Sequence, residues 1–504
     1  MLHLIQINVG LDPPQRRGRL TKVKEARPEP GYMQHKTFVG RQRTVSRSSI
    51  GVCWMRDDLR ARYGEERLPR YTSYPTAPQF SGAVGHEAYG QWLSELAPEA
   101  TASLYLHVPF CRSMCWYCGC HTTITQRDAP ILDYLAVLRR EIGLVADRIA
   151  KPIDVRHVHF GGGTPTIMEP AEFAGLMDLL RQRFSLGEGA EVAIEIDPRT
   201  LTRAMTAALG AAGVTRASLG VQSFDPVVQR AINRIQSYEQ TARATEGLRE
   251  AGIRGINFDL IYGLPHQTVE SCVETVKKSI ALRPERFSVF GYAHVPSFKK
   301  HQRRIEEAAL PGGEARYAQA EAIAEALVAA GYRRIGLDHY ALPEDTMVQA
   351  QDEGVLHRNF QGYTTDPGDV LIGFGASAIG RLTQGYAQNE VVLGRYAERI
   401  LRGELATAKG YALTADDRLR ADLIERIMCD FRVDVGQVCR QHETAPESIL
   451  KAIPKLRMLQ DDGIIRLEGN VLSVNEDARF LVRSVASAFD AYLGASGRTH
   501  SRAV

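Results

Sequence analysis

Short apolar or β-branched runs alternate with longer amphipathic stretches from residue 103 onward. The runs predict six strands, at 103–108, 155–160, 191–196, 216–221, 256–261 and 286–292. Between them, apolar residues spaced three and four apart predict helices at 131–149, 170–184, 200–212, 238–251 and 268–282. Strands that alternate with helices form a parallel sheet. Six units fall short of a closed eight-stranded barrel, so the pattern predicts an α/β fold with a partial, three-quarter TIM-like (β/α)6 barrel.

Polar or glycine-rich residues follow the end of every predicted strand. The first strand leads into a cysteine-rich loop, and the others lead into "GGGTPT", "DPRT", "QSFD", "YGLP" and "AHVP". In parallel α/β folds the carboxyl ends of the strands carry the chemistry. We therefore expect the six loops to face one another across one mouth of the barrel.

The remaining pattern divides the chain around this barrel. Residues 55–100 form an N-terminal segment, 101–400 the barrel with auxiliary elements, and 401–504 a C-terminal domain. In that domain, predicted helices near 415–430, 446–459 and 477–493 surround "DDGIIRLEGNVLSV", which is typical of a hairpin turning at Gly-Asn. The combination predicts a helical, winged-helix-like domain. Its mixed charge favours packing against the barrel over binding nucleic acid.

The composition adds a basic start to this organisation. Residues 1–54 carry ten Lys or Arg against three acidic residues, in a chain whose net charge is +3. A transit peptide or a basic arm is possible, but the prolines and acidic residues favour a disordered extension ahead of a working protein that opens at Met55. No apolar run is long enough to span a bilayer. With eight cysteines in 504 residues and no secretory signal, we expect a cytoplasmic protein with reduced thiols.

Four of the eight cysteines lie in "CRSMCWYCGC", with the spacing Cys111-x3-Cys115-x2-Cys118-x-Cys120. A disulfide knot is unfavourable at this low overall cysteine content. Structural zinc usually needs two separated pairs, and the other cysteines stand singly. Three thiolates from one loop suit a [4Fe–4S] cluster in which one iron keeps an open position. The spacing therefore favours Cys111, Cys115 and Cys118 as ligands and leaves Cys120 as a nearby thiol of catalytic or structural use.

CxxxCxxC after the first strand and GGGTP after the second resemble the radical S-adenosylmethionine enzymes. The resemblance covers nearly everything from residue 67 onward. "RYTSYPTAPQF", the fourth cysteine, "NFDLIYGLP", "YAHVPS" and "GVLHRNFQGYTT" further resemble the oxygen-independent coproporphyrinogen III oxidases (dehydrogenases) of haem biosynthesis. The related haem chaperones typically lack the fourth cysteine and the "RYTSYPTA" segment, through which substrate would enter.

This resemblance implies an oxidoreductase that converts two propionate side chains of coproporphyrinogen III to vinyl groups without oxygen, giving protoporphyrinogen IX. The implied cofactors are one [4Fe–4S] cluster and S-adenosylmethionine, two molecules per chain, with a 5′-deoxyadenosyl radical as the reactive species. The implied partner is an unidentified electron donor, and the implied working unit is a monomer. A haem chaperone, or another radical S-adenosylmethionine protein that acts on a tetrapyrrole, is the alternative.

The resemblance also assigns residue roles. The set expected to bind S-adenosylmethionine is Tyr105, Tyr117, Gly162, Gly163, Thr164, Glu195, Gln222, Arg234, Asp259, Ala293 and Ile379. Tyr105, Glu195 and Ile379 would contact the first molecule, with Tyr105 and Cys120 as catalytic candidates. Gln222, Arg234 and Asp259 would surround the second, beside Ala293. Tyr117 would lie near an adenine, at a position where family members often have Phe.

The implied substrate carries four propionates, so its site needs convergent cations. The candidates are Arg70 in "PRYTSYP" and His357 and Arg358 in "LHRNF". The "GFGASAIG" stretch at 373–380 superficially suggests a dinucleotide-binding turn. Its spacing is wrong and it does not open a βαβ unit, so we exclude that function.

Overall fold

A twelve-stranded sheet forms the framework of the molecule in the computed structural model, which describes residues 57–64 and 66–493. The predicted basic extension over 1–54 and Met55 lie outside these residues. Six parallel strands form the middle of the sheet in the order β1 (Thr101–Val108), β4 (Asp154–Gly162), β5 (Ser185–Ile196), β6 (Arg216–Gln222), β7 (Gly255–Tyr262) and β8 (Arg286–Gly291). The six predicted strands and their parallel arrangement are confirmed.

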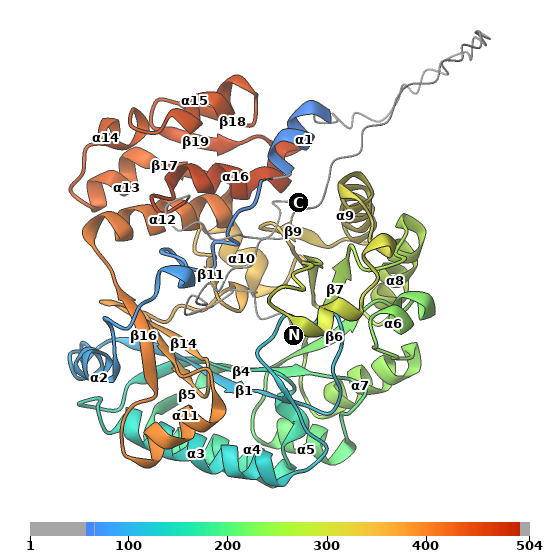
Figure 1. Cartoon of the computed structure of the whole chain (residues 1–504), viewed down its shortest axis with the longest axis vertical. Helices are drawn as coiled ribbons and strands as arrows, with labels where there is room; N and C mark the ends of the chain where they lie inside the picture. Colours follow the sequence, from blue (N-terminus) through green and yellow to red (C-terminus); the bar gives the residue numbers. More distant parts are fainter. Residues whose placement is uncertain (1–56, 65, 494–504) are drawn as a thin grey trace, which may run out of the picture.

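Helices cover the convex face of this curved sheet (Figure 1). They are α3 (Ala129–Ala146), α4 (Pro170–Arg183), α5 (Arg203–Ala211), α6 (Pro226–Ala231), α7 (Tyr238–Glu250) and α8 (Val269–Ala281). The sequence determines where α7 and α8 start, because Ser237 with Gln240 and Thr268 with Ser271 form capping boxes that satisfy the first free amides. The apolar faces of the helices meet the strands in one large core that includes Leu138.

The sheet extends beyond the predicted strands at both sides. β13 (Val370–Phe374) pairs in parallel with β1, which makes it a seventh parallel strand. The antiparallel strands β14 (Ile379–Leu382), β15 (Gly385–Asn389) and β16 (Thr407–Ala412) follow it, and β10 (His339–Ala341) and β9 (Arg333–Ile335) continue the sheet beyond β8. Among the described residues the sheet therefore ends at β16 and β9 without closing, as expected for a partial barrel.

The excluded "GFGASAIG" stretch is the turn between β13 and β14. A Cβ on Gly373 would lie 2.9 Å from the backbone of Ile379, so glycine here permits the close return of the chain. Smaller elements complete this part of the molecule: α2 (His86–Ser94), β2 (Phe110–Cys111), β3 (Thr123–Ile124), α9 (Gly313–Ala329), α10 (Thr346–Asp352), β11 (His357–Asn359), β12 (Gly362–Thr364) and α11 (Leu393–Leu401).

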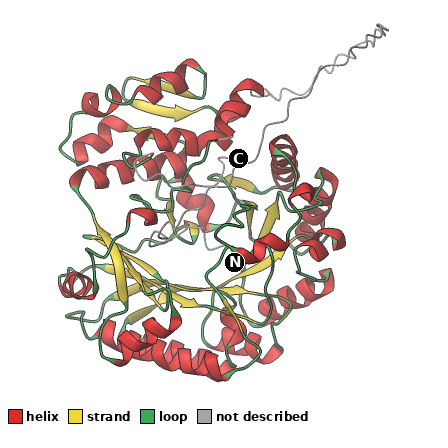
Figure 2. Cartoon of the chain, viewed as in Figure 1, coloured by secondary structure: helices red, strands yellow, loops and turns green. Residues whose placement is uncertain are grey.

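A separate helical layer lies across the concave side of the sheet, at the top of Figures 1 and 2. It contains α12 (Ala415–Asp430), α13 (Val435–Gln441), α14 (Pro446–Leu450), α15 (Pro454–Asp461), α16 (Val482–Ala486) and a three-stranded sheet in the order β17 (Arg432–Asp434), β19 (Val471–Val474), β18 (Ile465–Glu468). The predicted hairpin is confirmed as β18–β19. The single helices predicted at 446–459 and 477–493 are wrong. Pro454 opens a new helix in the first, and 3-10 turns flank α16 in the second.

The beginning of the described chain packs against this C-terminal layer. α1 (Asp57–Gly64) and the segment after it contribute Tyr63, Tyr71 and Tyr74 to the same core as Leu423 and Leu459. The Tyr63 hydroxyl donates to Asp462 at 2.6 Å, and the Tyr71 hydroxyl donates to Asp490 at 3.0 Å. The two ends of the described chain are thereby joined. None of the helices in the described ranges is long and apolar enough to cross a membrane.

Candidate active site

The cysteine loop is held at the carboxyl end of β1 by backbone hydrogen bonds at its two ends and its middle. The Thr123 amide donates to the Pro109 carbonyl at 2.7 Å, and the Thr125 amide donates to the Cys111 carbonyl at 3.1 Å. At the far side of the loop, the Trp116 amide donates to the Ile232 carbonyl, beyond the end of α6, at 2.9 Å. The loop is therefore closed at its base by its own backbone and fixed at its far side to the segment after α6.

The three predicted ligand sulfurs each accept hydrogen bonds. Cys111 Sγ accepts from the hydroxyls of Thr122 at 3.3 Å and Thr164 at 3.4 Å, and Cys118 Sγ accepts from the Cys120 amide at 3.4 Å. Burial raises the pKa of the Cys111 thiol to about 11, against the pull of its two hydroxyl donors. A thiol with a pKa this high stays protonated at neutral pH until a bound metal displaces the proton.

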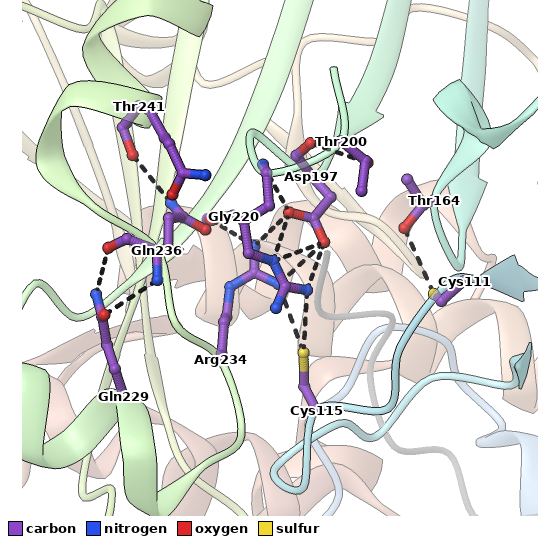
Figure 3. A network of polar contacts seen from close by, with 12 residues as sticks. Cys111, Cys115, Thr164, Asp197, Thr200, Gly220, Gln229, Arg234, Gln236 and Thr241 are labelled. Atoms are coloured by element: carbon purple, nitrogen blue, oxygen red, sulfur yellow. Dashed lines mark hydrogen bonds and ion pairs between the residues drawn. The ribbon is translucent and has the colours of Figure 1, made fainter. Parts of the chain in front are cut away.

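Cys115 is held by two arginines that share one carboxylate, as Figure 3 shows for Arg234 and Asp197. The guanidiniums of Arg199 and Arg234 each lie 3.5 Å from Cys115 Sγ. Arg199 Nη2 lies 2.6 Å from Asp197, and Arg234 Nη2 lies 3.4 Å from it. Burial opposes the charge on Asp197, but the two arginines hold the pKa of this carboxyl at about 2. The group is therefore ionised and keeps both donors aimed at the sulfur.

A rigid turn fixes Arg234 in this position. The Gln229 side chain donates to the carbonyls of Ser223 at 2.8 Å and Gln236 at 2.6 Å, and accepts from the Gln236 amide at 3.0 Å. Arg234 Nη2 donates to the Gly220 carbonyl at 2.7 Å, and its side chain is 1% exposed. An arginine this deeply buried is a built feature of the site, because burial of a guanidinium is costly unless it is paired.

The glycines of GGGTP bring the end of β4 against the cysteine loop. A Cβ on Gly162 would lie 2.7 Å from the His107 ring, and one on Gly163 would lie 2.5 Å from the Phe110 carbonyl oxygen. Gly162 also has a φ of +115°, which favours glycine. Any other residue at these two positions would push the strand away from the loop.

Tyr105 of β1 and Glu195 of β5 lie on the two strands that flank β4, close to two histidines that the sequence analysis missed. The Tyr105 hydroxyl is 2.9 Å from His107 Nδ1, and Glu195 accepts from the Gly162 amide at 3.0 Å. His159 Nε2 is 3.6 Å from Glu195. His107 lies two residues from Tyr105 along β1. The period-two pattern that places both on one face was the available signal.

Two of the residues predicted to surround the second S-adenosylmethionine, Gln222 and Asp259, lie on β6 and β7. Gln222 is 1% exposed, has a φ of +64°, and neither atom of its side-chain amide has a hydrogen-bond partner. A buried amide without partners is costly, so this group points to a polar ligand. Asp259 accepts from Ser218 at 3.0 Å and from Asn257 at 2.8 Å. Gln222 ends β6, whereas Asp259 lies within β7 as the register partner of Gly220, whose carbonyl accepts from Arg234 at 2.7 Å.

Ala293, Tyr117 and Ile379 are placed by their backbones. Gln302 Nε2 donates to the carbonyls of Tyr117 at 3.1 Å and Ala293 at 3.3 Å, which ties the loop after β8 to the cysteine loop. His301 and Lys299 reach the carbonyls of Cys118 and Cys120 at 2.7 and 3.0 Å. Sequence reasoning missed these three residues, because nothing in "FKKHQRR" distinguishes it from a solvated basic stretch. Ile379 begins the partly exposed strand β14 and lies opposite Gly373 of β13. Gly373 is in turn the register partner of Tyr105 on β1.

The three predicted substrate residues are divided by the structure. Arg70 and Arg358 line one cavity, where Arg358 Nε donates to the Arg70 carbonyl at 3.4 Å. His357 does not line that cavity, and its Nδ1 lies 3.3 Å from Glu425 of α12.

The residues present fit an iron–sulfur cube. All four thiols of the loop, Cys120 included, line a small cavity together with Gly162 and Gly163. Cluster thiolates commonly accept hydrogen bonds of the kind that Cys111, Cys115 and Cys118 accept. In the described part of the chain, no three His, Cys, Asp or Glu side chains come close enough to hold one metal ion.

A partial parallel barrel with a CxxxCxxC loop at the carboxyl end of its first strand defines a radical S-adenosylmethionine protein, and the family model described as the radical SAM superfamily matches residues 105–278. Proteins of this superfamily carry a [4Fe–4S] cluster and use S-adenosylmethionine. An oxygen-independent coproporphyrinogen III oxidase from Bradyrhizobium diazoefficiens is 64% identical over 450 residues, covering 89% of this chain and 100% of the relative. The chain belongs to the family of oxygen-independent coproporphyrinogen III oxidases.

Other relatives agree with this assignment. A second oxidase of the same name, from Paracoccus denitrificans, is 43% identical over 442 residues, covering 87% of this chain and 97% of the relative. The solved structure of coproporphyrinogen III oxidase from Escherichia coli, described as a radical SAM enzyme, superposes with a TM-score of 0.81 at 39% identity. It covers 85% of this chain and 100% of that chain, so the shared fold includes the barrel and most of its additions.

Proposed function

We propose that this chain catalyses the anaerobic oxidative decarboxylation of two propionate side chains of coproporphyrinogen III to vinyl groups, giving protoporphyrinogen IX. The observation that carries the proposal is the convergence of three hydrogen-bonded thiols with the Gly162–Gly163 backbone at one edge of the sheet. Family membership supplies the substrate, because the relatives are named for it.

The protein's own groups set up this reaction. S-adenosylmethionine held at the cluster would supply, on one-electron reduction, the radical chemistry that removes a propionate β-hydrogen. Loss of CO2, and of one electron to a separate acceptor, would then leave the vinyl group. Cys111, Cys115 and Cys118 would hold the irons, and Arg199 and Arg234 would keep the charge on the Cys115 thiolate stabilised. Glu195 would bind the amino end of the first S-adenosylmethionine, beside the glycine turn whose Gly162 amide donates to it.

A second S-adenosylmethionine is proposed beside β6 and β7. The support for this site is Gln222, whose buried side-chain amide has no partner, with Asp259 on β7 and with Arg234, which donates to the neighbouring β6 backbone. A polar nucleoside with an amino-acid end offers donors and acceptors for such groups. Two molecules per chain would match two propionates per substrate, one radical for each.

The chain is proposed to work as a monomer in the cytoplasm. No disulfide joins any of the seven cysteines in the described residues, which suits a compartment where thiols are kept reduced. Because no group in the described site is proposed as an electron source, a separate one-electron donor is the implied partner. Cys120 is proposed as a thiol beside the site that is not an iron ligand.

The test is one strictly anaerobic turnover of the iron-reconstituted protein with dithionite, S-adenosylmethionine and coproporphyrinogen III, with products resolved by mass. Loss of two CO2 with formation of methionine and 5′-deoxyadenosine is expected. Cys118→Ala should lose iron and turnover, whereas Cys272→Ala, a buried thiol on α8, should keep both. Cleavage of S-adenosylmethionine with unchanged porphyrinogen would refute the substrate. Tight haem binding without either reaction would favour a haem chaperone.

A further inference from the structure

A second cavity, of about 440 Å³, lies between the barrel and the C-terminal layer. Its walls come from the end of β7, the loop after β8, α9, the N-terminal segment and the region around α16. It shares no lining residue with the cavity at the cysteine loop. Six arginines line it: Arg67, Arg70, Arg316, Arg334, Arg358 and Arg483.

The positive charges in this cavity outnumber its carboxylates, which are Glu307, Glu321 and Asp338. Glu321 pairs with Arg334 at 3.4 Å, and Asp338 lies 3.8 Å from Arg358. Glu307 lies 3.2 Å from a histidine on the cavity wall. Even with every carboxylate matched to one arginine, the lining keeps a surplus of positive charge.

The arginines are close enough to disfavour one another's charge. Burial lowers the pKa of Arg483 to about 9, and Arg70 and Arg358 add to the effect. Burial likewise lowers the pKa of Arg70, with Arg358 and Arg316 contributing. Arg358 has a side chain that is 2% exposed, and its Nη1 has no hydrogen-bond partner. Gathering like charges in a partly desolvated space costs free energy, which anions bound there would recover.

The cavity adjoins the machinery of the proposed reaction. Arg70 Nη2 donates to the Gly291 carbonyl, at the end of β8, at 3.1 Å. Two residues further along, Ala293 lines the cavity, and its carbonyl shares the Gln302 side chain with the carbonyl of Tyr117 in the cysteine loop. The segment from Gly291 to Ala293 therefore links the arginine cavity to the cysteine loop.

The size and charge of the cavity fit carboxylate side chains better than a whole tetrapyrrole. Its volume corresponds to on the order of fifteen water molecules, which is room for two propionates and part of a ring. Guanidinium groups bind carboxylates with short, charge-assisted hydrogen bonds. Lipid or nucleic acid would instead need an open surface.

We propose that this arginine cavity anchors the two propionates of coproporphyrinogen III that the reaction leaves intact. The inference rests on the proposed function and adds the site that orients the substrate. An arginine paired with a carboxylate that leaves as neutral CO2 would slow the reaction, because the ion pair stabilises the reactant more than the transition state. The propionates that persist in the product are the ones that strong ion pairs can hold without slowing the chemistry.

The test uses two fluorescent porphyrins, titrated anaerobically into the reconstituted protein. Coproporphyrin III carries all four propionates, whereas deuteroporphyrin IX carries only the two that the reaction retains. Arg316→Gln, on the half-exposed face of α9, is expected to raise the Kd of both porphyrins by the same factor, about tenfold. Arg316→Lys should recover part of the loss. Arg395→Gln, an exposed arginine of α11 outside the cavity, is the matched control and should change neither Kd.

Three results would overturn the inference. Weakened binding of coproporphyrin III alone would mean that the cavity holds the reacting propionates. Unchanged binding of both porphyrins by Arg316→Gln and by a second variant, Arg67→Gln, with unaltered Tm, would remove the cavity from the substrate site. Equal loss in Arg395→Gln would indicate a general charge effect. Turnover of the unaltered protein separates the two proposals: if it fails while Arg316→Gln still weakens both porphyrins, only the proposed reaction is wrong.

Discussion

Replacing Asp197 by Asn removes the one carboxylate that neutralises Arg199 and Arg234 beside Cys115. Asp197 is 4% exposed, and its pKa of about 2, instead of 3.8, corresponds to about 2–3 kcal/mol of stabilisation of its charged form. Breaking a buried pair from one side typically costs about 3–5 kcal/mol, because the partner stays buried and charged. Asp197→Asn should therefore lower the free energy of unfolding of the iron-free protein by about 3 kcal/mol. The Tm should fall by about 3 °C in calorimetry, because the entropy of unfolding of so long a chain is large.

The same substitution should also disturb the cluster. With the carboxylate gone, the two guanidiniums lose the group that aims them at Cys115, so the potential of the reconstituted cluster should shift measurably in an EPR-monitored titration. Asp178→Asn is the control, since Asp178 faces Arg181 at 3.5 Å on the surface with both side chains largely exposed, where an ion pair is worth about 0–1 kcal/mol. Equal Tm values for the two variants would refute the argument that this buried network stabilises the fold.

Three further changes test other parts of the site and fold. Gly163→Ala should abolish cluster assembly, measured as iron content, because its Cβ would lie 2.5 Å from a backbone oxygen, whereas Gly82→Ala, with open space around it, should not. Gln222→Ala should reduce bound S-adenosylmethionine from two per cluster to one in equilibrium dialysis, with iron content unchanged; retention of two would remove Gln222 from the second site. Burial raises the pKa of Glu141 from 4.5 to about 7. The neutral carboxyl therefore makes its full contribution to the free energy of unfolding below about pH 4.5, and this contribution is lost as the pH rises through 7. Thermal unfolding should show this loss, about 3 kcal/mol, in the unaltered protein but not in Glu141→Gln.

The parallel framework was predictable because its signals are local. Strand 256–261 is buried along its whole length, whereas strand 155–160 alternates buried Val155, Val158 and Phe160 with more exposed residues. Each is followed by a loop and an amphipathic helix, which the sequence pattern shows. β13 was missed because no helix follows it: its glycine-rich end turns straight back into β14. The prediction of one helix over 446–459 is wrong, because α14 ends at Leu450 and Pro454 starts a second helix, although the apolar pattern continues across the break.

The site was predictable only where a motif carries it. The cysteines and glycines are recognisable from their spacing, and the structure places them in one cavity. Arg199 and Gln302 were not predicted, since an arginine in "DPRT" or a glutamine in a basic stretch is usually a solvated side chain. Their contacts with Cys115 and Tyr117 depend on how loops more than 80 residues apart meet. Substrate residues were least predictable, and the six arginines come from segments spread over the whole described chain.

The joining of the chain's two ends has a consequence for the order of assembly during synthesis. The partial barrel and its cysteine loop can fold as they leave the ribosome, since domains form from the N-terminal side onward. Tyr63 and Tyr71 cannot be buried until residues near 460–490 exist, because those residues supply their partners. Arg70 and Arg483, one from each end, meet last, so the wall that closes the arginine cavity is the final part of the molecule to form. It follows that the arginine cavity stays incomplete until the ribosome has made almost the whole of the described chain.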